Sequence, residues 1–134
     1  MTVYDFAGYV GGSCVGPAGW TCTVQNVGFT PSVVTPDPAD NVSIVNITWT
    51  HTSGSTTIGG VDLGVFSARS SNGTITQGAY TGRAVRNDGP FAGTIGSNTG
   101  TIAVPNVPEP ATLGLIGAGL IGLGLLRRKR PSGL

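Results

Sequence analysis

An uncharged apolar run near the C-terminal end constrains this chain more than any other feature. Residues 113–126 hold only Leu, Ile, Gly and Ala, so no side chain there carries charge or forms a hydrogen bond. A helix over residues 111–126 would be about 24 Å long, whereas the hydrocarbon core of a bilayer is about 30 Å thick. The run therefore predicts a short transmembrane helix, with bilayer thinning and snorkelling arginines making up the difference.

The segments on either side define the ends of this helix. The basic cluster that follows it comprises Arg127, Arg128, Lys129 and Arg130. By the positive-inside rule, the cluster keeps residues 127–134 in the cytoplasm and leaves everything before Pro108 outside. Pro108 and Pro110 are excluded from a helix interior and favour extended backbone before them, so residues 105–112 form a linker. A run this short could instead form a buried helix of a soluble domain. The prolines before it and the basic cluster after it argue against this alternative.

The order of these parts resembles a known sorting signal. Val-Pro-Glu-Pro-Ala-Thr, a short Gly/Leu helix and an arginine-rich end are similar to the PEP-CTERM signal of Gram-negative bacteria over roughly residues 105–130. The resemblance implies that an exosortase, a membrane protease or transpeptidase, recognises Pro108, Glu109 and Pro110. It also implies that residues 113–126 are a temporary anchor and that the basic cluster stops transfer. The preceding domain would then reach the cell surface or an exopolysaccharide matrix.

The N-terminal end departs from this pattern. Proteins that resemble this one in their tail normally begin with a secretory signal peptide. The opening residues, Met1-Thr2-Val3-Tyr4-Asp5-Phe6, lack its basic and apolar regions. The sequence therefore predicts a misassigned start codon or an N-terminally truncated ectodomain over residues 1–104.

The chain before the tail is mildly acidic. Residues 1–107 carry three arginines against five aspartates, which gives a formal charge of −2. Nucleic-acid binding needs a concentrated basic face, so this class is excluded. A glycoside hydrolase needs two carboxylates across a cleft, and these acids fall mostly in expected turns. The sequence thus predicts no catalytic residue and no cofactor. It favours a non-enzymatic surface or matrix protein over a small secreted hydrolase or carbohydrate-binding module with an unrecognised site.

The ectodomain predicts a small all-β sandwich. Short runs of β-branched residues alternate with turn residues, and no helical period occurs before Ala111. Strands are expected over residues 3–10, 21–30, 41–51, 61–70, 74–85, 91–95 and 101–104. A strong turn is expected at residues 87–90, where the sequence reads Asn-Asp-Gly-Pro. The expected core comprises Ile44, Ile47, Trp49, Leu63, Val65, Phe66, Tyr80 and Phe91.

The two cysteines predict one disulfide. Cys14 and Cys22 are the only cysteines of the chain, and outside the cytoplasm a pair at this spacing can close a small loop. Two free buried thiols are the alternative. A metal centre needs more ligands nearby, and His51 is the only histidine, so no metal site is predicted.

Other candidate sites have ordinary structural alternatives. Asp37, Asp40 and Asn41 supply oxygen ligands suited to Ca²⁺, but turn chemistry explains them better. His51 is expected to be an exposed residue at a strand end rather than a catalytic base. Five aromatic residues could stack on sugar rings if they are exposed. For Trp49, which lies in a strongly apolar strand, packing in the core is the more ordinary expectation. These aromatic residues are Trp20, Trp49, Tyr4, Tyr9 and Tyr80. No regular Thr-x-Thr ladder that would suggest ice binding is seen along the chain.

Overall fold

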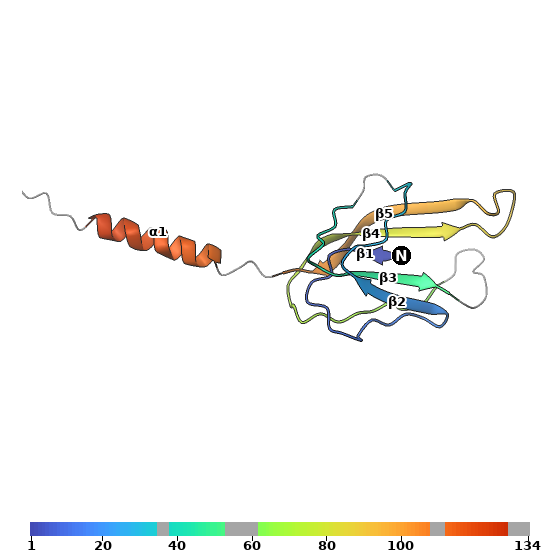
Figure 1. Cartoon of the computed structure of the whole chain (residues 1–134), viewed down its shortest axis with the longest axis horizontal. Coiled ribbons are helices and arrows are strands. Elements are labelled where there is room, and N and C mark those ends of the chain that lie inside the picture. Colours follow the sequence, from blue (N-terminus) through green and yellow to red (C-terminus); the bar gives the residue numbers. More distant parts are fainter. Residues whose placement is uncertain (35–37, 53–61, 108–111, 129–134) are drawn as a thin grey trace, which may run out of the picture.

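The computed structural model describes residues 1–34, 38–52, 62–107 and 112–128. These residues form five strands and one helix (Figure 1). The elements are β1 (Thr2–Val3), β2 (Trp20–Gln25), β3 (Asn46–His51), β4 (Ile75–Val85), β5 (Ile95–Pro105) and α1 (Thr112–Arg128).

The strands form one antiparallel sheet in the order β2-β3-β1-β4-β5. The two-residue strand β1 therefore lies at the centre of the sheet, and the N-terminal end of the chain lies there too (Figure 1). The long hairpin of β4 and β5 turns over residues 86–94, where Gly89 and Gly93 adopt φ of 73° and 84°. The Gly93 amide donates to the Arg86 carbonyl at 2.7 Å. The turn predicted at residues 87–90 is confirmed.

Loops rather than a second sheet cover one face. The core consists of Val3, Ile47, Trp49 and Val104. The Phe66 ring packs edge-on against Trp20 and Trp49, with centroid distances of 5.0 and 5.9 Å. Segments 4–19 and 62–71 form this cover. Two isolated bridges, Tyr9 with Ser70 and Val15 with Ser67, and several hydrogen bonds of serine side chains join them. The all-β expectation for the ectodomain is confirmed. The sandwich expectation is corrected, since the described strands make a single sheet.

The loop after β2 covers the opposite face. Tyr4 is fully buried there, and its hydroxyl donates to the Phe29 carbonyl at 3.0 Å. Gly28 lies so close to the Tyr4 ring that any side chain at this position would clash with it. Pro31 is buried in the same layer. Tyr4 therefore fixes the β2–β3 loop to the sheet.

Several strand boundaries differ from the sequence expectation. The first strand ends at Val3 because Asp5 adopts a left-handed φ of 55° and turns the chain out of the sheet. A strand was expected over residues 61–70, but residues 62–70 form none, and only Ser67 and Ser70 among them take part in isolated bridges. Residue 61 lies outside the described residues. Residues 91–94 belong to the hairpin turn, and residues 96–100 lie inside β5 rather than in a loop.

Part of the expected core is exposed. Ile47 and Trp49 are buried as expected, whereas Leu63, Val65 and Phe91 are exposed. The other three residues of the expected core are partly buried: Ile44, Phe66 and Tyr80. Leu63 and Val65 fall in a segment that forms no strand, so the alternation of apolar residues there does not create a buried face.

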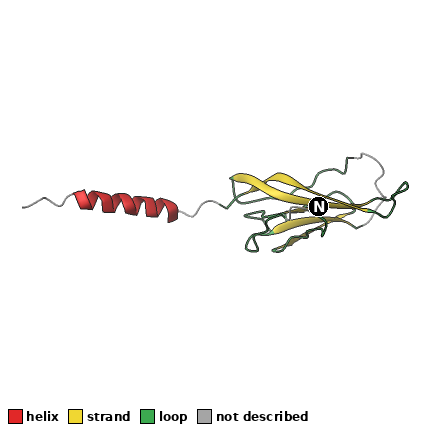
Figure 2. Ribbon diagram, turned by 90° about the horizontal axis from the view of Figure 1, so that it is seen from above, coloured by secondary structure: helices red, strands yellow, loops and turns green. Residues whose placement is uncertain are grey.

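Helix α1 does not pack against the strands (Figures 1 and 2). It has 17 residues, which corresponds to about 25 Å. Its described leucine and isoleucine side chains are 59–73% exposed, and they are Leu115, Ile116, Leu120, Ile121 and Leu123. Within the described ranges, no helix combines the length and the apolar character that crossing a membrane requires.

Candidate functional site

The tail presents an apolar helix that ends in basic residues. Arg127 and Arg128 are the last two residues of α1. The expected recognition element, Pro108, Glu109 and Pro110, lies outside the described residues, as do Lys129 and Arg130. The described apolar side chains of α1 point in all directions around the helix axis, so the helix has no polar face between residues 114 and 124.

The acidic residues near the β2–β3 loop hold backbone rather than a cation. Asp40 accepts hydrogen bonds from the Gly28 amide at 2.9 Å and the Asn46 side-chain amide at 2.8 Å. Asp5 accepts from the Asn41 amide at 2.9 Å. Asp37 lies outside the described residues. In the described part of the chain, no three His, Cys, Asp or Glu side chains gather in a way that could hold a metal.

The two other described acids also serve turns. Asp62 accepts from the Gly64 amide at 2.8 Å, and Asp88 from the Gly89 amide at 2.7 Å. His51 is exposed at the end of β3, as expected, and its ring centroid lies 5.2 Å from that of Trp20.

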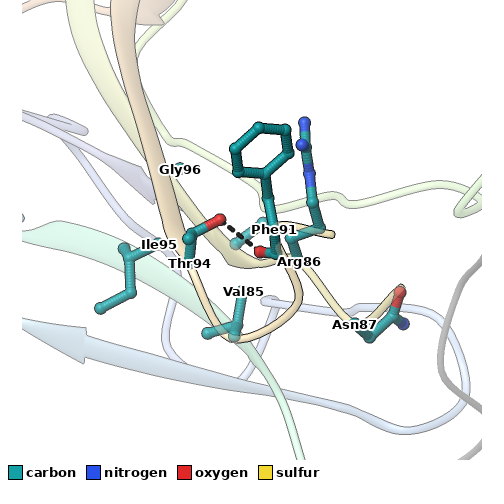
Figure 3. Close-up of a pocket in the computed structure, with 8 residues that line it drawn as sticks. Val85, Arg86, Asn87, Phe91, Thr94, Ile95 and Gly96 are labelled. Atoms are coloured by element: carbon teal, nitrogen blue, oxygen red, sulfur yellow. Dashed lines mark hydrogen bonds between the residues drawn. The ribbon is translucent and has the colours of Figure 1, made fainter. Parts of the chain in front are cut away.

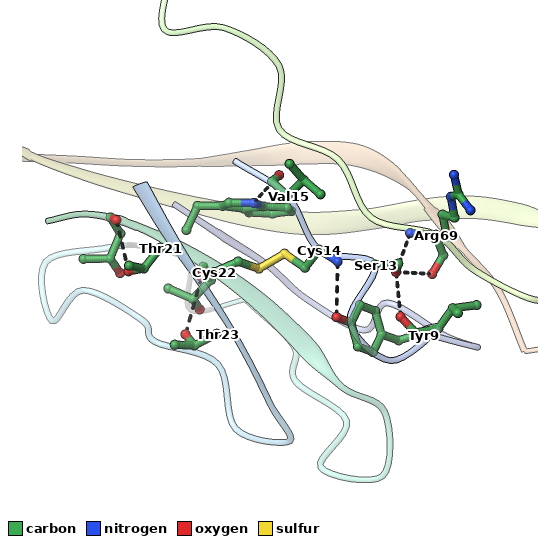
Figure 4. Close-up of a disulfide and its surroundings, with 12 residues drawn as sticks. Tyr9, Ser13, Cys14, Val15, Thr21, Cys22, Thr23 and Arg69 are labelled. Carbon is green, nitrogen blue, oxygen red and sulfur yellow. Dashed lines mark hydrogen bonds between the residues drawn. A yellow bond between two sulfur atoms is a disulfide. The ribbon is translucent and has the colours of Figure 1, made fainter. Parts of the chain in front are cut away.

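The structure joins Cys14 and Cys22 in a disulfide (Figure 4). Their Cα atoms are 6.2 Å apart, within the range of such bridges. The bond links the loop after β1 to β2, and polar contacts hold that loop in place. The Cys14 amide donates to the Tyr9 hydroxyl at 3.3 Å, and Trp49 Nε1 donates to the Val15 carbonyl at 3.0 Å.

A row of threonines crosses the whole sheet. Strand register places Thr23, Thr48, Thr2, Thr81 and Thr99 side by side, one from each strand. The Thr2 and Thr48 hydroxyls are 3.0 Å apart, so one donates to the other. The three central threonines are buried, so the row stabilises the sheet instead of presenting hydroxyls to solvent. Sequence reasoning missed this row because it runs across strands rather than along one.

An open depression of about 610 Å³ lies at the tip of the β4–β5 hairpin (Figure 3). The Arg86 guanidinium lies over the Phe91 ring, 5.6 Å from its centroid. The Phe91 ring is 60% exposed. By contrast, the aromatic residues singled out for sugar stacking are buried or partly buried. Phe91 was missed because the apolar pattern assigned it to the core.

These features define a small β-sheet domain followed by a C-terminal apolar helix. The family model described as the PEP-CTERM protein-sorting motif matches residues 106–130. The chain therefore carries this motif, which supports an exported protein sorted by an exosortase. The comparisons with curated proteins and with solved structures gave no match.

Proposed function

We propose that this chain is a non-enzymatic surface or extracellular-matrix protein that an exosortase processes at its tail. The motif match over residues 106–130 carries the proposal. In this route, residues 113–126 hold the chain in the inner membrane, and residues 1–104 face outward. Processing near Pro108, Glu109 and Pro110 then passes the β-domain to the surface or to an exopolysaccharide matrix.

The exposed apolar surface of α1 supports a temporary anchor. A helix that is apolar on all sides is normally buried in a protein core or a membrane, and α1 packs on no described strand. Because its length of about 25 Å is less than the hydrocarbon thickness, the bilayer must thin around it. That mismatch suits a segment that is removed soon after insertion.

The hydrogen bonds of the acidic residues support a non-enzymatic role. The four described aspartates each accept a backbone amide, and these residues are Asp5, Asp40, Asp62 and Asp88. A carboxylate committed to a turn is a poor partner for a second carboxylate across a cleft. The β-domain is therefore proposed to act through its surface.

The test is localisation and mass in the native host, with and without its exosortase. Glu109→Ala with Pro110→Ala should leave the chain full-length and membrane-bound, whereas the unaltered chain should lose its tail and reach the surface fraction. The matched control, Asp88→Ala with Pro90→Ala, likewise removes one acidic residue and one proline, here from the hairpin turn, and should be processed normally. If a chain that lacks residues 108–130 reached the same cellular fraction by the same route, with or without the exosortase, the proposal would be refuted.

A second test isolates the membrane step. In cells without the exosortase, the full-length chain should resist extraction by carbonate, and protease added to spheroplasts should digest the β-domain. A full-length chain that is soluble in the periplasm would exclude the anchor, even where the motif is still needed for sorting.

The hairpin depression favours carbohydrate binding as a second function. An exposed aromatic ring beside a guanidinium offers stacking and hydrogen-bond donors to a sugar. Phe91→Ala should weaken binding to host exopolysaccharide in a co-sedimentation assay. Phe29→Ala removes another exposed ring and should not. Equal binding by all three chains would exclude the depression as the site.

A further inference from the structure

Strand β5 forms one edge of the described sheet (Figure 1). At one end of the β4–β5 ladder the Arg86 amide donates to the Thr94 carbonyl, and at the other the Asn106 amide donates to the Thr74 carbonyl, both at 2.9 Å. Because hydrogen-bonded pairs alternate along antiparallel strands, the even-numbered residues of β5 bond to β4. The odd-numbered residues point their N–H and C=O groups outward, and they are Ile95, Ser97, Thr99, Thr101, Ala103 and Pro105.

The outward backbone groups of residues 95–103 bond to none of the residues that the structure describes. The next group, the Pro105 carbonyl, accepts from the Ala7 amide at 3.3 Å, which closes this end of the edge. The opposite edge strand, β2, offers less. The bond from the Thr52 amide to the Gly19 carbonyl sets its alternation, so that its free outward residues are Cys22 and Val24. A β5–β2 contact would therefore leave most of the β5 edge unpaired.

Nothing in the sequence of β5 prevents pairing with another strand. Natural proteins usually protect an exposed edge with a charged residue, a proline or a bulge. Residues 95–104 contain no charged residue and no proline, and β5 pairs with β4 residue for residue, without a bulge. The side chains of Ile95 and Ile102 are exposed on this strand. Strand β5 therefore suits a partner that adds a strand to the sheet.

We propose that the outer edge of β5 pairs with the same edge of a second copy of this chain, antiparallel, about a twofold axis at Thr99. In this register Thr99 lies opposite Thr99 of the second copy, Ser97 opposite Thr101, and Ile95 opposite Ala103. All the open residues of both edges then exchange hydrogen bonds, about ten in total. The two sheets become one continuous sheet.

The side chains favour this register over its two neighbours. With the axis at Thr99, Gly96 lies opposite Ile102 and Gly100 opposite Asn98, so each glycine is paired with a larger side chain. A shift of the axis by one residue in either direction sets Gly100 opposite a glycine and moves an open residue out of the paired stretch.

The threonine row supports the same axis. Thr99 is the last of the five threonines that lie side by side across the sheet. With the axis at Thr99, this row continues directly into the row of the second copy. Cross-strand threonine pairs stabilise a sheet, and no other register joins the two rows.

Cysteine cross-linking of the full chain in detergent micelles tests the register. Opposed residues of a hydrogen-bonded antiparallel pair have Cα atoms about 5.5 Å apart, which a disulfide spans. Thr99→Cys should therefore form a covalent dimer on mild oxidation. The matched control is Thr101→Cys, at another outward threonine of β5. Its two copies would lie about 13 Å apart along the strands, so its cross-linking should be slower by about tenfold or more. Equal rates, which association through α1 alone would give, or no dimer from either variant, would overturn the proposal.

Hydrogen exchange of the unaltered chain provides a measurement without any substitution. Detergent is kept in excess, so that most micelles hold one chain, and the protein concentration is raised. The amides of Ser97, Thr99 and Thr101 should then exchange more slowly by about tenfold or more. The amides of Cys22 and Val24 are the internal control and should not change. Exchange at β5 that does not depend on concentration would contradict the proposal. Added protection at Cys22 and Val24 would mean that β5 pairs with β2 of the next copy, and the twofold pair would be wrong.

Discussion

The hydroxyl of Tyr4 is the most informative single group to remove. It lies fully buried between the sheet and the β2–β3 loop. It bonds to the Phe29 carbonyl at 3.0 Å, to the Thr81 hydroxyl at 3.2 Å and to the Thr30 hydroxyl. Tyr4→Phe keeps the ring and deletes these bonds. After the change, Thr81 still donates to Phe29 at 3.3 Å, so part of the polar set remains satisfied.

The hydrogen bonds that Tyr4→Phe deletes determine how much stability the change should cost. A net hydrogen bond contributes about 1 kcal/mol, and a buried polar group left without a partner costs about 1–3 kcal/mol. Because the Phe29 carbonyl still accepts a hydrogen bond from Thr81, Tyr4→Phe should lower the free energy of unfolding by about 2 kcal/mol. For a domain of this size, that corresponds to a fall of about 10 °C in the unfolding temperature.

Urea unfolding followed by near-UV circular dichroism measures this loss. Tyr9→Phe is the matched control, because the half-buried Tyr9 hydroxyl only accepts from the Cys14 amide at 3.3 Å. It should cost less than about 1 kcal/mol. Thr81→Val should change the free energy of unfolding by different amounts in the unaltered chain and in Tyr4→Phe, because the two hydroxyls interact. Two results would contradict this reasoning. One is an equal loss of stability in Tyr9→Phe and Tyr4→Phe, and the other is additive losses for Tyr4→Phe and Thr81→Val. Either would show that the hydrogen bonds of the Tyr4 hydroxyl do not fix the loop.

Three further predictions address other groups. The unreduced chain should not gain mass on alkylation, and replacing Cys14 and Cys22 by serine should cost about 2.5 kcal/mol of stability. Because burial lowers the pKa of the Met1 amine from 8.0, the unfolded chain binds more protons than the folded one in the pH range between the lowered pKa and about 8. Urea unfolding should therefore show stability rising with pH towards roughly 8 and then levelling. Met1 acetylation, which removes the ionisable amine, should abolish the rise. The Ser97 hydroxyl is buried without a partner among the described residues, so thermal unfolding of Ser97→Ala should show equal or greater stability.

Local signals in the sequence predicted the tail helix and the turn between β4 and β5. The Asn-Asp-Gly-Pro turn at residues 87–90 needs only short-range chemistry, and the structure places it as expected. The apolar run predicted a helix, which the structure gives as Thr112–Arg128. A strand was expected over residues 41–51, but β3 begins only at Asn46. Asn46 is buried and bonds to Asp5 and Asp40, a role that hydrophobic patterning cannot reveal.

Features that depend on the partner strand could not be predicted. The Thr2–Thr48 contact joins residues 46 positions apart, and only the order β3-β1-β4 brings Thr81 beside Thr2. The same holds for Leu63, whose alternation with Val65 looks like a strand although no strand lies beside it. Composition records which residues are available, whereas topology decides which of them meet.

The small core gives the proposed export route a physical consequence. Among the described residues, only four side chains form the buried cluster of the sheet, so backbone pairing, buried hydroxyls and the Cys14–Cys22 bond must supply much of the stability. A disulfide that stabilises by about 2.5 kcal/mol forms only in an oxidising compartment. Before export the β-domain is therefore closer to the unfolded state, which is the state that a secretion channel accepts. After export the closed loop of Cys14 and Cys22 shifts the balance towards the folded domain, at the place where the tail is to be processed.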